Sequence, residues 1–351
     1  MRAMHKLKVG VIGATGFSGI ELLHLLFRHP GVEVDFLASD QFAGRTYASV
    51  LGLIGGGRQT FISRDEAWQR LASMTPSDSC VFLATPAEVS REWMGRLKEL
   101  SIPAVDLSGA FRLEDTGQSE QHYGASVPAE VYGLPELNRA AIKKAKTISN
   151  PGCYATAVTL ALAPLLVEEL IETSGIVVNA LSGVSGAGRK SSEDFSFMSI
   201  DSDVRAYRIF RHQHEPEIRQ TLSRTIEGAP VSLTFVPHLL PVARGILATS
   251  IATLKKGVTS DQVREAFLDH YSLEPFIDLA KDASEVRIHD TVGTNVCRIG
   301  LAVDSQEGRV AVVSSIDNLI KGAAGQAIQN FNLISGFPET TALSTLRRFL
   351  V

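Results

Sequence analysis

Cys153, in the segment Ser149-Asn-Pro-Gly-Cys153-Tyr-Ala-Thr, has the side chain best suited to covalent chemistry. Asn-Pro-Gly favours a turn, and the residues from Thr156 onward have a helical pattern, so Cys153 is expected at or near a helix N-terminus. Backbone amides at that end of a helix stabilise the thiolate, which is the nucleophilic form. Cys80 and Cys297 lie inside apolar strand patterns, where a buried structural thiol is expected. The sequence therefore predicts one catalytic cysteine.

A nucleophilic thiol needs a proton partner, and His212-Gln-His214-Glu-Pro216-Glu-Ile is the dense cluster among nine histidines. Zinc binding is one interpretation, but the spacing matches no common zinc-helix signature, and Pro216 argues against a regular helix through the cluster. A solvated charged loop is another. We expect one imidazole to activate Cys153 and later to protonate the product oxygen, with no metal. The residues do not separate His212 from His214, although we favour His212.

A glycine-rich turn near the N-terminus indicates a dinucleotide cofactor. It joins an apolar stretch at residues 6–13, a predicted strand, to residues 20–28, a predicted helix, and a second strand is expected at 32–38. Glycines in such a turn let backbone amides approach a pyrophosphate, which the helix N-terminus stabilises. Glycines needed only for positive φ are the plain alternative. The expected cofactor contacts are Gly13, Thr15, Gly16, Phe17, Ser18 and Gly19.

The residues after the second strand bear on the choice between NAD and NADP. Ser39 can donate to a 2′-phosphate and Arg45 can pair with it, whereas Asp40 would favour NAD if it pointed at the ribose. We expect NADP(H).

Arginines in loops are candidates for holding an anionic substrate. Arg112 follows an expected strand end and can face a cleft between domains, and Arg189 and Arg244 lie in similar loops. A surface arginine is the ordinary interpretation of each.

The elements around these residues indicate two domains, for which 351 residues suffice. Strands expected at 80–84 and 104–107 alternate with helices, which predicts a doubly wound parallel sheet. Later strand-like runs are separated by stretches too short for crossover helices, which predicts a mixed, mainly antiparallel sheet; they are 231–236, 246–254, 296–303 and 310–315. We expect an α/β protein. A Rossmann-type domain spans 1–152, completed by a C-terminal helix within 318–351, and an α+β domain for catalysis and oligomerisation spans 153–317.

The composition points to a soluble cytoplasmic protein with small-molecule partners. A formal net charge of −4 gives no electrostatic reason to bind nucleic acid or an anionic membrane. No run of 18 apolar residues predicts a membrane span. Three widely spaced cysteines fit a reducing compartment better than a disulfide framework.

Taken in order, the motifs resemble the N-acetyl-gamma-glutamyl-phosphate reductase family, NADPH-dependent enzymes of arginine biosynthesis in the semialdehyde dehydrogenase superfamily. The resemblance covers nearly the whole chain. Its segments are Gly13-Ala-Thr-Gly16-Phe-Ser-Gly19, Asp106-Leu-Ser-Gly-Ala-Phe-Arg112, Tyr132-Gly-Leu-Pro-Glu136, Asn150-Pro-Gly-Cys153-Tyr, Ser182-Gly-Val-Ser-Gly-Ala-Gly-Arg189, His212-Gln-His214-Glu-Pro-Glu217-Ile, Val236-Pro-His238, Arg244-Gly-Ile-Leu and Asp317-Asn-Leu-Ile-Lys-Gly-Ala-Ala-Gly-Gln326.

The resemblance implies that Cys153 forms a thioester and that the histidine pair carries the proton. It implies that Arg112 and Glu217 help to hold the substrate, where we also expect Asn150, Arg189 and Arg244. Near the nicotinamide it implies Ser182, Gly183 and Asn318, and we expect further cofactor contacts from Thr85, Pro86 and Gly186. Two departures stand out: Gly109-Ala110 replaces the commoner Ala-Asp, and Asp40 stands where many members have a basic or neutral residue.

The implied reaction is reduction of N-acetyl-gamma-glutamyl phosphate, an acyl phosphate, to the semialdehyde and phosphate by a homodimer or homotetramer. One alternative is the carrier-linked glutamyl or aminoadipyl phosphate reductase of lysine biosynthesis, which would need a basic surface for an acidic carrier. Aspartate-semialdehyde dehydrogenase is another, but it usually has Asn-Cys where Gly152-Cys153 stands here. A non-catalytic NADP-binding regulator is a third, against which the intact cysteine and histidines argue.

Overall fold

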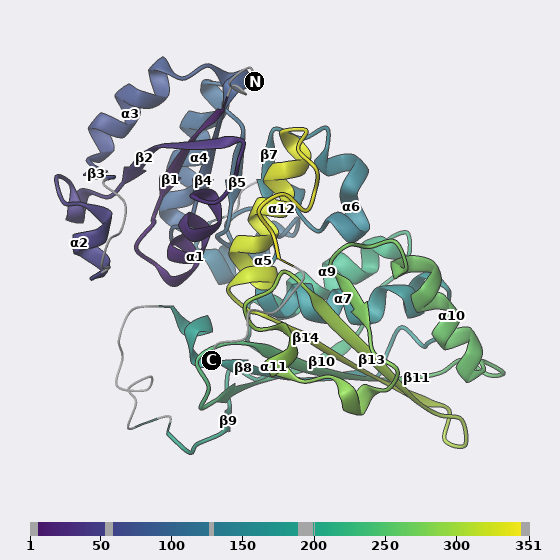
Figure 1. Ribbon diagram of the computed structural model, residues 1–351. Coiled ribbons are helices and arrows are strands. Elements are labelled where there is room, and N and C mark those ends of the chain that lie inside the picture. The colour runs from purple at the N-terminus through teal and green to yellow at the C-terminus, as the bar shows by residue number, and fades with distance from the viewer. Residues whose placement is uncertain (1–5, 53–58, 126–129, 189–198, 200, 345–351) are drawn as a thin grey trace. The chain divides into compact units, whose positions relative to one another are not determined.

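The computed structural model describes residues 6–52, 59–125, 130–188, 199 and 201–344 (Figure 1). The chain divides into two compact units. The first is formed by Met1–Pro151 with Ala324–Leu343, and the second by Gly152–Ala323 with Ser344–Val351. None of the described helices is long and apolar enough to cross a bilayer.

The first unit is built on a parallel sheet whose seven described strands have the order β3-β2-β1-β4-β5-β7-β6. All its strand pairs are parallel, as the alternation of strands and helices predicts. The strands are β1 (Leu7–Ile12), β2 (Val32–Ala38), β3 (Phe61–Ile62), β4 (Ser79–Leu83), β5 (Ala104–Asp106), β6 (Val131–Tyr132) and β7 (Thr147–Ser149). The helices are α1 (Phe17–Leu26), α2 (Tyr47–Leu51), α3 (Arg64–Ser73), α4 (Ala87–Glu99), α5 (Thr116–Tyr123), α6 (Pro135–Ile142) and α12 (Gly325–Ile334).

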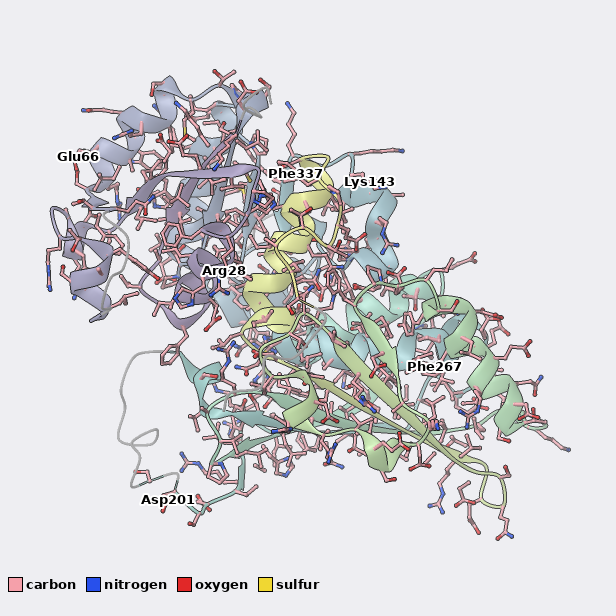
Figure 2. The ribbon with its side chains drawn as sticks, in the orientation of Figure 1. Arg28, Glu66, Lys143, Asp201, Phe267 and Phe337 are labelled. Carbon is pink, nitrogen blue, oxygen red and sulfur yellow. The ribbon has the colours of Figure 1, made fainter. Side chains whose placement is uncertain are left out.

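The last helix, α12, packs on this sheet although it comes from the other end of the chain. It contacts α1, α6 and β5, and its Phe331 joins the buried core of the sheet. Phe337, labelled in Figure 2, packs its ring on His29 and Phe331, with centroids 4.9 and 6.0 Å away. Charged side chains such as Glu66 and Lys143 are exposed. Aromatic packing therefore holds α12 and Phe337 on the parallel sheet.

The register of the parallel sheet brings its functional loops to one edge. Ile12 lies opposite both Ala38 and Leu83, Leu83 lies opposite Asp106, and Asp106 lies opposite Ser149. Because these residues end their strands at one level, the loops that follow meet at the carboxyl edge, where open α/β sheets bind ligands.

The second unit has a mixed sheet of seven described strands in the order β12-β13-β14-β11-β8-β10-β9. Four of its six pairings are antiparallel, and β8 with β10 and β12 with β13 are parallel. The strands are β8 (Ile176–Gly183), β9 (Arg205–Ala206), β10 (Leu233–Leu240), β11 (Ile246–Thr253), β12 (Ile277–Leu279), β13 (Cys297–Asp304) and β14 (Arg309–Ile316). The α-helices are α7 (Cys153–Val167), α9 (His214–Thr225), α10 (Ser260–Tyr271) and α11 (Ile288–Thr291), and a π-helix spans Ile320–Ala324. The predicted fold class is confirmed for both sheets.

Helix α7 is the buried centre of the second unit. Every residue from Tyr154 to Leu166 is buried, because the helix packs against β11 and β14 on one side and against α9 and α10 on the other. A helix that is apolar on all sides is stable only in such a position. The first turn of α7 is thereby held rigidly.

The opposite face of the mixed sheet carries apolar side chains that the unit leaves partly uncovered. Ile251 on β11 lies opposite Val177 on β8 and Ala311 on β14, and Ala311 lies opposite Ala302 on β13. Val177 and Ile251 are 36% and 38% exposed. This row crosses four strands, and we call it the open-face row.

Candidate active site

Cys153 is the first residue of α7, three residues before the predicted helical stretch. Gly152 is the N-cap, and its carbonyl accepts the first helical hydrogen bond from the Thr156 amide (2.9 Å). The Cys153 side chain is partly exposed, whereas Cys80 and Cys297 are buried as predicted, and burial raises the pKa of the Cys80 thiol. The helix N-terminus favours a thiolate at Cys153.

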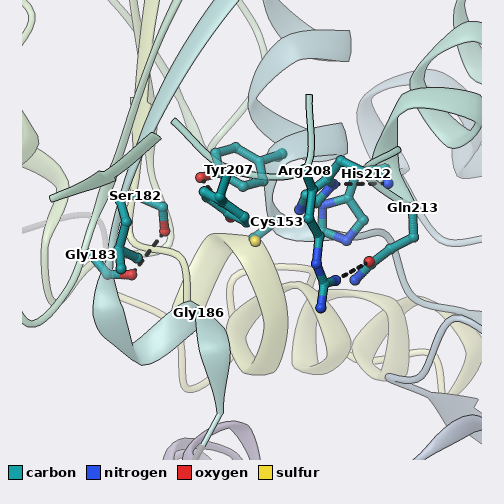
Figure 3. Close-up of a pocket in the computed structure, with 11 residues that line it drawn as sticks. Cys153, Ser182, Gly183, Gly186, Tyr207, Arg208, His212 and Gln213 are labelled. Carbon is teal, nitrogen blue, oxygen red and sulfur yellow. Dashed lines mark hydrogen bonds between the residues drawn. The ribbon is translucent and has the colours of Figure 1, made fainter. Parts of the chain in front are cut away.

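Cys153 opens into a cavity of about 340 Å³ within the second unit (Figure 3). The lining residues come from the start of α7, the end of β8 and the 3₁₀ turn after it, the loop before α9, the first residue of α9, and β10. They are Cys153, Tyr154, Ser182, Gly183, Gly186, Tyr207, Arg208, His212, Gln213, His214 and Leu239. The cavity thus brings together the predicted cysteine, both predicted histidines and three predicted cofactor contacts, Ser182, Gly183 and Gly186.

The two imidazoles are buried and differ in their hydrogen bonds. The backbone N–H of His214 donates to Nδ1 of His212 (3.1 Å), and the two rings meet edge to face with centroids 4.8 Å apart. A nitrogen that accepts from a backbone N–H carries no proton, so this bond holds His212 as the neutral tautomer with its proton on Nε2. His212 is therefore able to donate a hydrogen bond through Nε2.

The expectation that Pro216 prevents a helix through the histidine cluster is wrong. Helix α9 begins at His214, and Pro216 lies in its first turn. Proline is tolerated there because the first amides of a helix have no carbonyl partner within it. The helix start places the His214 ring at the cavity.

Glu217 holds the N-terminus of α7 in place. Its side chain is fully buried, and Oε1 accepts a hydrogen bond from the Gly152 amide (2.7 Å). Gly152 has no room for a side chain, because a Cβ there would lie 2.4 Å from Nε2 of His214. Glu217 does not line the cavity. The carboxylate and the glycine together hold Cys153 and His214 close to each other.

Two tyrosines complete the wall beside the sulfur, and sequence reasoning missed them. The hydroxyls of Tyr154 and Tyr207 are 3.2 Å apart, and that of Tyr154 also donates to the His238 carbonyl (3.3 Å). Burial, together with the negative charge of Cys153, raises the pKa of Tyr207 to about 12, and burial raises that of Tyr154 as well. Both remain neutral at physiological pH and can act only as hydrogen-bonding groups.

Two of the arginines predicted to bind the substrate, Arg112 and Arg244, form hydrogen bonds or ion pairs within their own units. In the first unit, Arg112 is buried and donates to the carbonyls of Asn150 (2.8 Å) and Leu107 (3.0 Å). It therefore braces the loops after β5 and β7. In the second unit, Arg244 pairs with the buried Asp317 at 3.0 Å. Arg189 lies outside the described residues.

Asn150 and Asn318 also form internal bonds. Asn150 is buried and its Oδ1 accepts from Nδ2 of Asn330 (3.0 Å), within the first unit. In the second unit, Oδ1 of Asn318 accepts from the Gly245 amide (2.7 Å) and its Nδ2 donates to Ser185 (3.0 Å). Asn318 thereby holds the loop that begins at Ser182 and Gly183.

The glycine-rich turn of the first unit has the geometry of a dinucleotide site. Gly13 has φ +84°, and a Cβ there would lie 2.4 Å from the Ala84 carbonyl oxygen. Gly16 is the N-cap of α1, so the helix begins inside the motif, at Phe17. Thr15 belongs to the same turn, and Ser18 and Gly19 to the first turn of α1. The amides at this helix start can bind a pyrophosphate.

Beside this turn the first unit has a pocket of about 160 Å³. It is formed at the carboxyl edge of β1, β2 and β4, where a dinucleotide places its adenosine ribose. Its lining residues are Ile12, Gly13, Ala38, Ser39, Asp40, Arg64, Thr85, Val89 and Trp93. Pro86 is the N-cap of α4 just beyond Thr85. The described residues thus fit an adenine dinucleotide.

The arginine at this pocket is Arg64, not Arg45. Arg45 is exposed with its guanidinium 5.8 Å from the Phe42 ring centroid, and it does not line the pocket. Asp40 accepts from the Arg64 amide (2.7 Å), and the Arg64 guanidinium lies 3.6 Å from the same carboxylate and 2.9 Å from Glu92. The start of α3 therefore partly offsets the charge of Asp40.

Comparisons with known proteins agree with this geometry. Residues 8–145 match the family model described as "Semialdehyde dehydrogenase, NAD binding domain", and residues 153–318 match "Semialdehyde dehydrogenase, dimerisation domain". The chain is 43% identical to an N-acetyl-gamma-glutamyl-phosphate reductase of Pelotomaculum thermopropionicum, over 96% of this chain and 97% of the relative. The chain belongs to the N-acetyl-gamma-glutamyl-phosphate reductase family. It is an oxidoreductase of the semialdehyde dehydrogenase superfamily.

Solved structures support the fold at low sequence identity. An aspartate semialdehyde dehydrogenase II of Vibrio cholerae superposes with a TM-score of 0.72 at 18% identity, covering 94% of this chain and 98% of that chain. The enzyme of Candida albicans, solved with NADP, gives 0.69 at 17% identity, with coverage of 94% and 98%.

Proposed function

We propose that this chain reduces N-acetyl-gamma-glutamyl phosphate to N-acetylglutamate semialdehyde with release of phosphate, using NADPH and a thioester on Cys153. The observation that carries the proposal is Cys153 at the start of α7, in one cavity with His212 and His214. Relatives about 40% identical over nearly the full chain are named for this reaction. The three cysteines form no disulfide, which fits a role in the cytoplasm.

In the first half of the reaction, the Cys153 sulfur attacks the acyl carbon. His214 takes the thiol proton, so that the sulfur attacks as a thiolate. The C–O bond to phosphate breaks, the phosphate oxygen keeps the electron pair, and His214 returns the proton to it. The acyl group then remains as a thioester on the sulfur.

In the second half, bound NADPH supplies the hydride. The Nε2–H of His212 donates to the oxygen that carries the developing negative charge, and one such donor is worth on the order of 3 kcal/mol. The C–S bond then breaks and returns its electron pair to sulfur, which releases the aldehyde. We therefore assign the proton transfer to His214 and the oxyanion contact to His212, whereas the sequence alone led us to favour His212 for the proton.

We assign the preference for NADPH to Ser39 and Arg64, both at the pocket of the first unit. Replacing Arg64 by glutamine should raise the KM for NADPH about tenfold, because Asp40 and Glu92 would then face the 2′-phosphate without a cation. The KM for NADH should change much less, and steady-state kinetics with both coenzymes measure the two values. Arg45→Gln is the matched control. Equal changes in the KM values for NADPH and NADH would show that Arg64 does not recognise the 2′-phosphate.

We also propose that the open-face row binds a second copy of this chain. The family model covering residues 153–318 is described as a dimerisation domain, and two members of the row, Val177 and Ile251, are exposed apolar side chains.

Ile251→Asp should therefore reduce the solution mass to about half that of the wild type, because a carboxylate would be buried at the two-fold contact. Light scattering after size exclusion measures the mass, and circular dichroism checks the fold. Leu268→Asp, an equally apolar-to-acidic change on α10, should leave the mass unchanged. A monomeric wild type, or a folded Ile251 variant of full mass, would refute the interface.

The reaction itself is tested in reverse. NADP⁺ should be reduced in the presence of N-acetylglutamate semialdehyde and phosphate, and not when phosphate is omitted. Aspartate semialdehyde and a carrier-linked substrate should give at most a few per cent of that rate at equal concentration. A higher rate with aspartate semialdehyde would identify an aspartate-semialdehyde dehydrogenase, and a higher rate with the carrier-linked substrate would identify the carrier-linked reductase. No reduction of NADP⁺ with any of the three would favour a non-catalytic role.

A further inference from the structure

The cavity around Cys153 has one permanently charged cation among its described lining residues. Of the eleven residues, Arg208 alone is a lysine or arginine. The proposed substrate carries an acyl phosphate at one end and an α-carboxylate at the other. Neither Arg112 nor Arg244 lines this cavity, and both bond within their own units.

Arg208 is held at the cavity by a constrained loop between β9 and α9. It has φ +47°, and Phe210 in the same loop has φ +59°, which are costly values for residues with side chains. The Tyr207 amide is tied to the Pro237 carbonyl (3.0 Å), and the Arg211 amide closes a turn on the Arg208 carbonyl (3.0 Å). Such strain indicates that the position of this side chain matters.

The guanidinium is bound to a neutral group rather than to a carboxylate. Its Nη1 donates to Oε1 of Gln213 (2.9 Å), and within the described part of the chain no carboxylate lies within 4.0 Å of it. Gln213 lies between His212 and His214 in the sequence and lines the same cavity. Figure 3 shows the Arg208 side chain reaching beside His212 toward Gln213. A guanidinium and an amide side by side form a planar set of donors suited to a carboxylate.

We propose that Arg208, with Gln213 beside it, binds the α-carboxylate of the substrate and so favours an aldehyde that carries this group over one that lacks it. This assignment rests on the proposed function. The Arg208 guanidinium bonds to Gln213. Figure 3 shows Arg208 and Gln213 on one side of the Cys153 sulfur, and Ser182 and Gly183, which are expected near the nicotinamide, on the other side. The charge of Arg208 therefore matches the end of the substrate that does not react.

The test uses the full-length enzyme in the reverse direction. In Arg208→Gln, the KM for N-acetylglutamate semialdehyde should rise at least about tenfold, whereas the KM for phosphate and the kcat change little. Arg208→Lys should recover part of the loss, because it keeps the charge without the planar fork. Arg211→Gln, in the same loop but outside the cavity lining, is the matched control and should behave as the wild type.

A substrate without the carboxylate completes the design. With 4-acetamidobutanal, which is the semialdehyde lacking that group, the wild type and Arg208→Gln should have the same kcat/KM. A rise in the KM for phosphate instead, an unchanged KM for the semialdehyde, or an equal loss on both aldehydes would overturn the assignment. If the wild type itself does not reduce NADP⁺ with the semialdehyde and phosphate, the proposed function fails first.

Discussion

Replacing Cys153 by serine should lower the rate of phosphate-dependent NADP⁺ reduction by more than about a thousandfold, because the thioester cannot form. The dissociation constant for NADPH should not change, since the proposed nucleotide contacts lie mainly in the first unit. Initial rates and fluorescence titration measure the two quantities.

Alkylation tests the reactivity of the Cys153 thiol independently of turnover. Iodoacetamide should modify the native wild type at one cysteine, because Cys80 and Cys297 are buried and Cys153 is partly exposed. The serine variant should not be modified, and circular dichroism should show that it is folded. Serine activity within about tenfold of the wild type would refute covalent catalysis by Cys153.

His214→Asn should lower kcat by about 10²- to 10⁴-fold, the usual contribution of a general acid–base group. It should also remove one limb of the pH profile of kcat/KM and slow the alkylation of Cys153, because the thiolate would lose its proton acceptor.

His212→Asn is the matched comparison from the same loop. It should lower kcat as well, through loss of one hydrogen-bond donor, but should keep both limbs of the pH profile and the alkylation rate of the wild type. The hydrogen bond from the His214 amide to His212 is the reason for this difference. If the two variants exchange these behaviours, the assignment of roles is reversed.

Much of the fold could be predicted because the patterns are local. Val32–Ala38 forms β2 with the predicted bounds, since Val32, Val34 and Phe36 alternate toward the core. The glycine turn after β1 could be recognised from its spacing alone. The helix start at Cys153 was also indicated, because Asn-Pro-Gly precedes an apolar run.

The side-chain geometry of the site is harder to predict from the sequence, because it depends on residues that are far apart in the chain. Arg45 is close to Ser39 in sequence, yet Arg64 lines the pocket because β3 pairs with β2 and brings the start of α3 there. Tyr207 and Arg208 lie in a loop without periodicity, which carried no signal. The tautomer of His212 depends on one backbone hydrogen bond that no residue pattern encodes.

The burial of Cys80 and Cys297 has a consequence under oxidative stress. Peroxide converts an accessible thiolate to a sulfenic acid, and a neighbouring thiol normally captures that product as a disulfide before it is oxidised further. Here both other sulfurs are sealed in the protein interior, so the oxidised enzyme has no resolving cysteine of its own. Its recovery would depend on a small thiol such as glutathione that can enter the cavity.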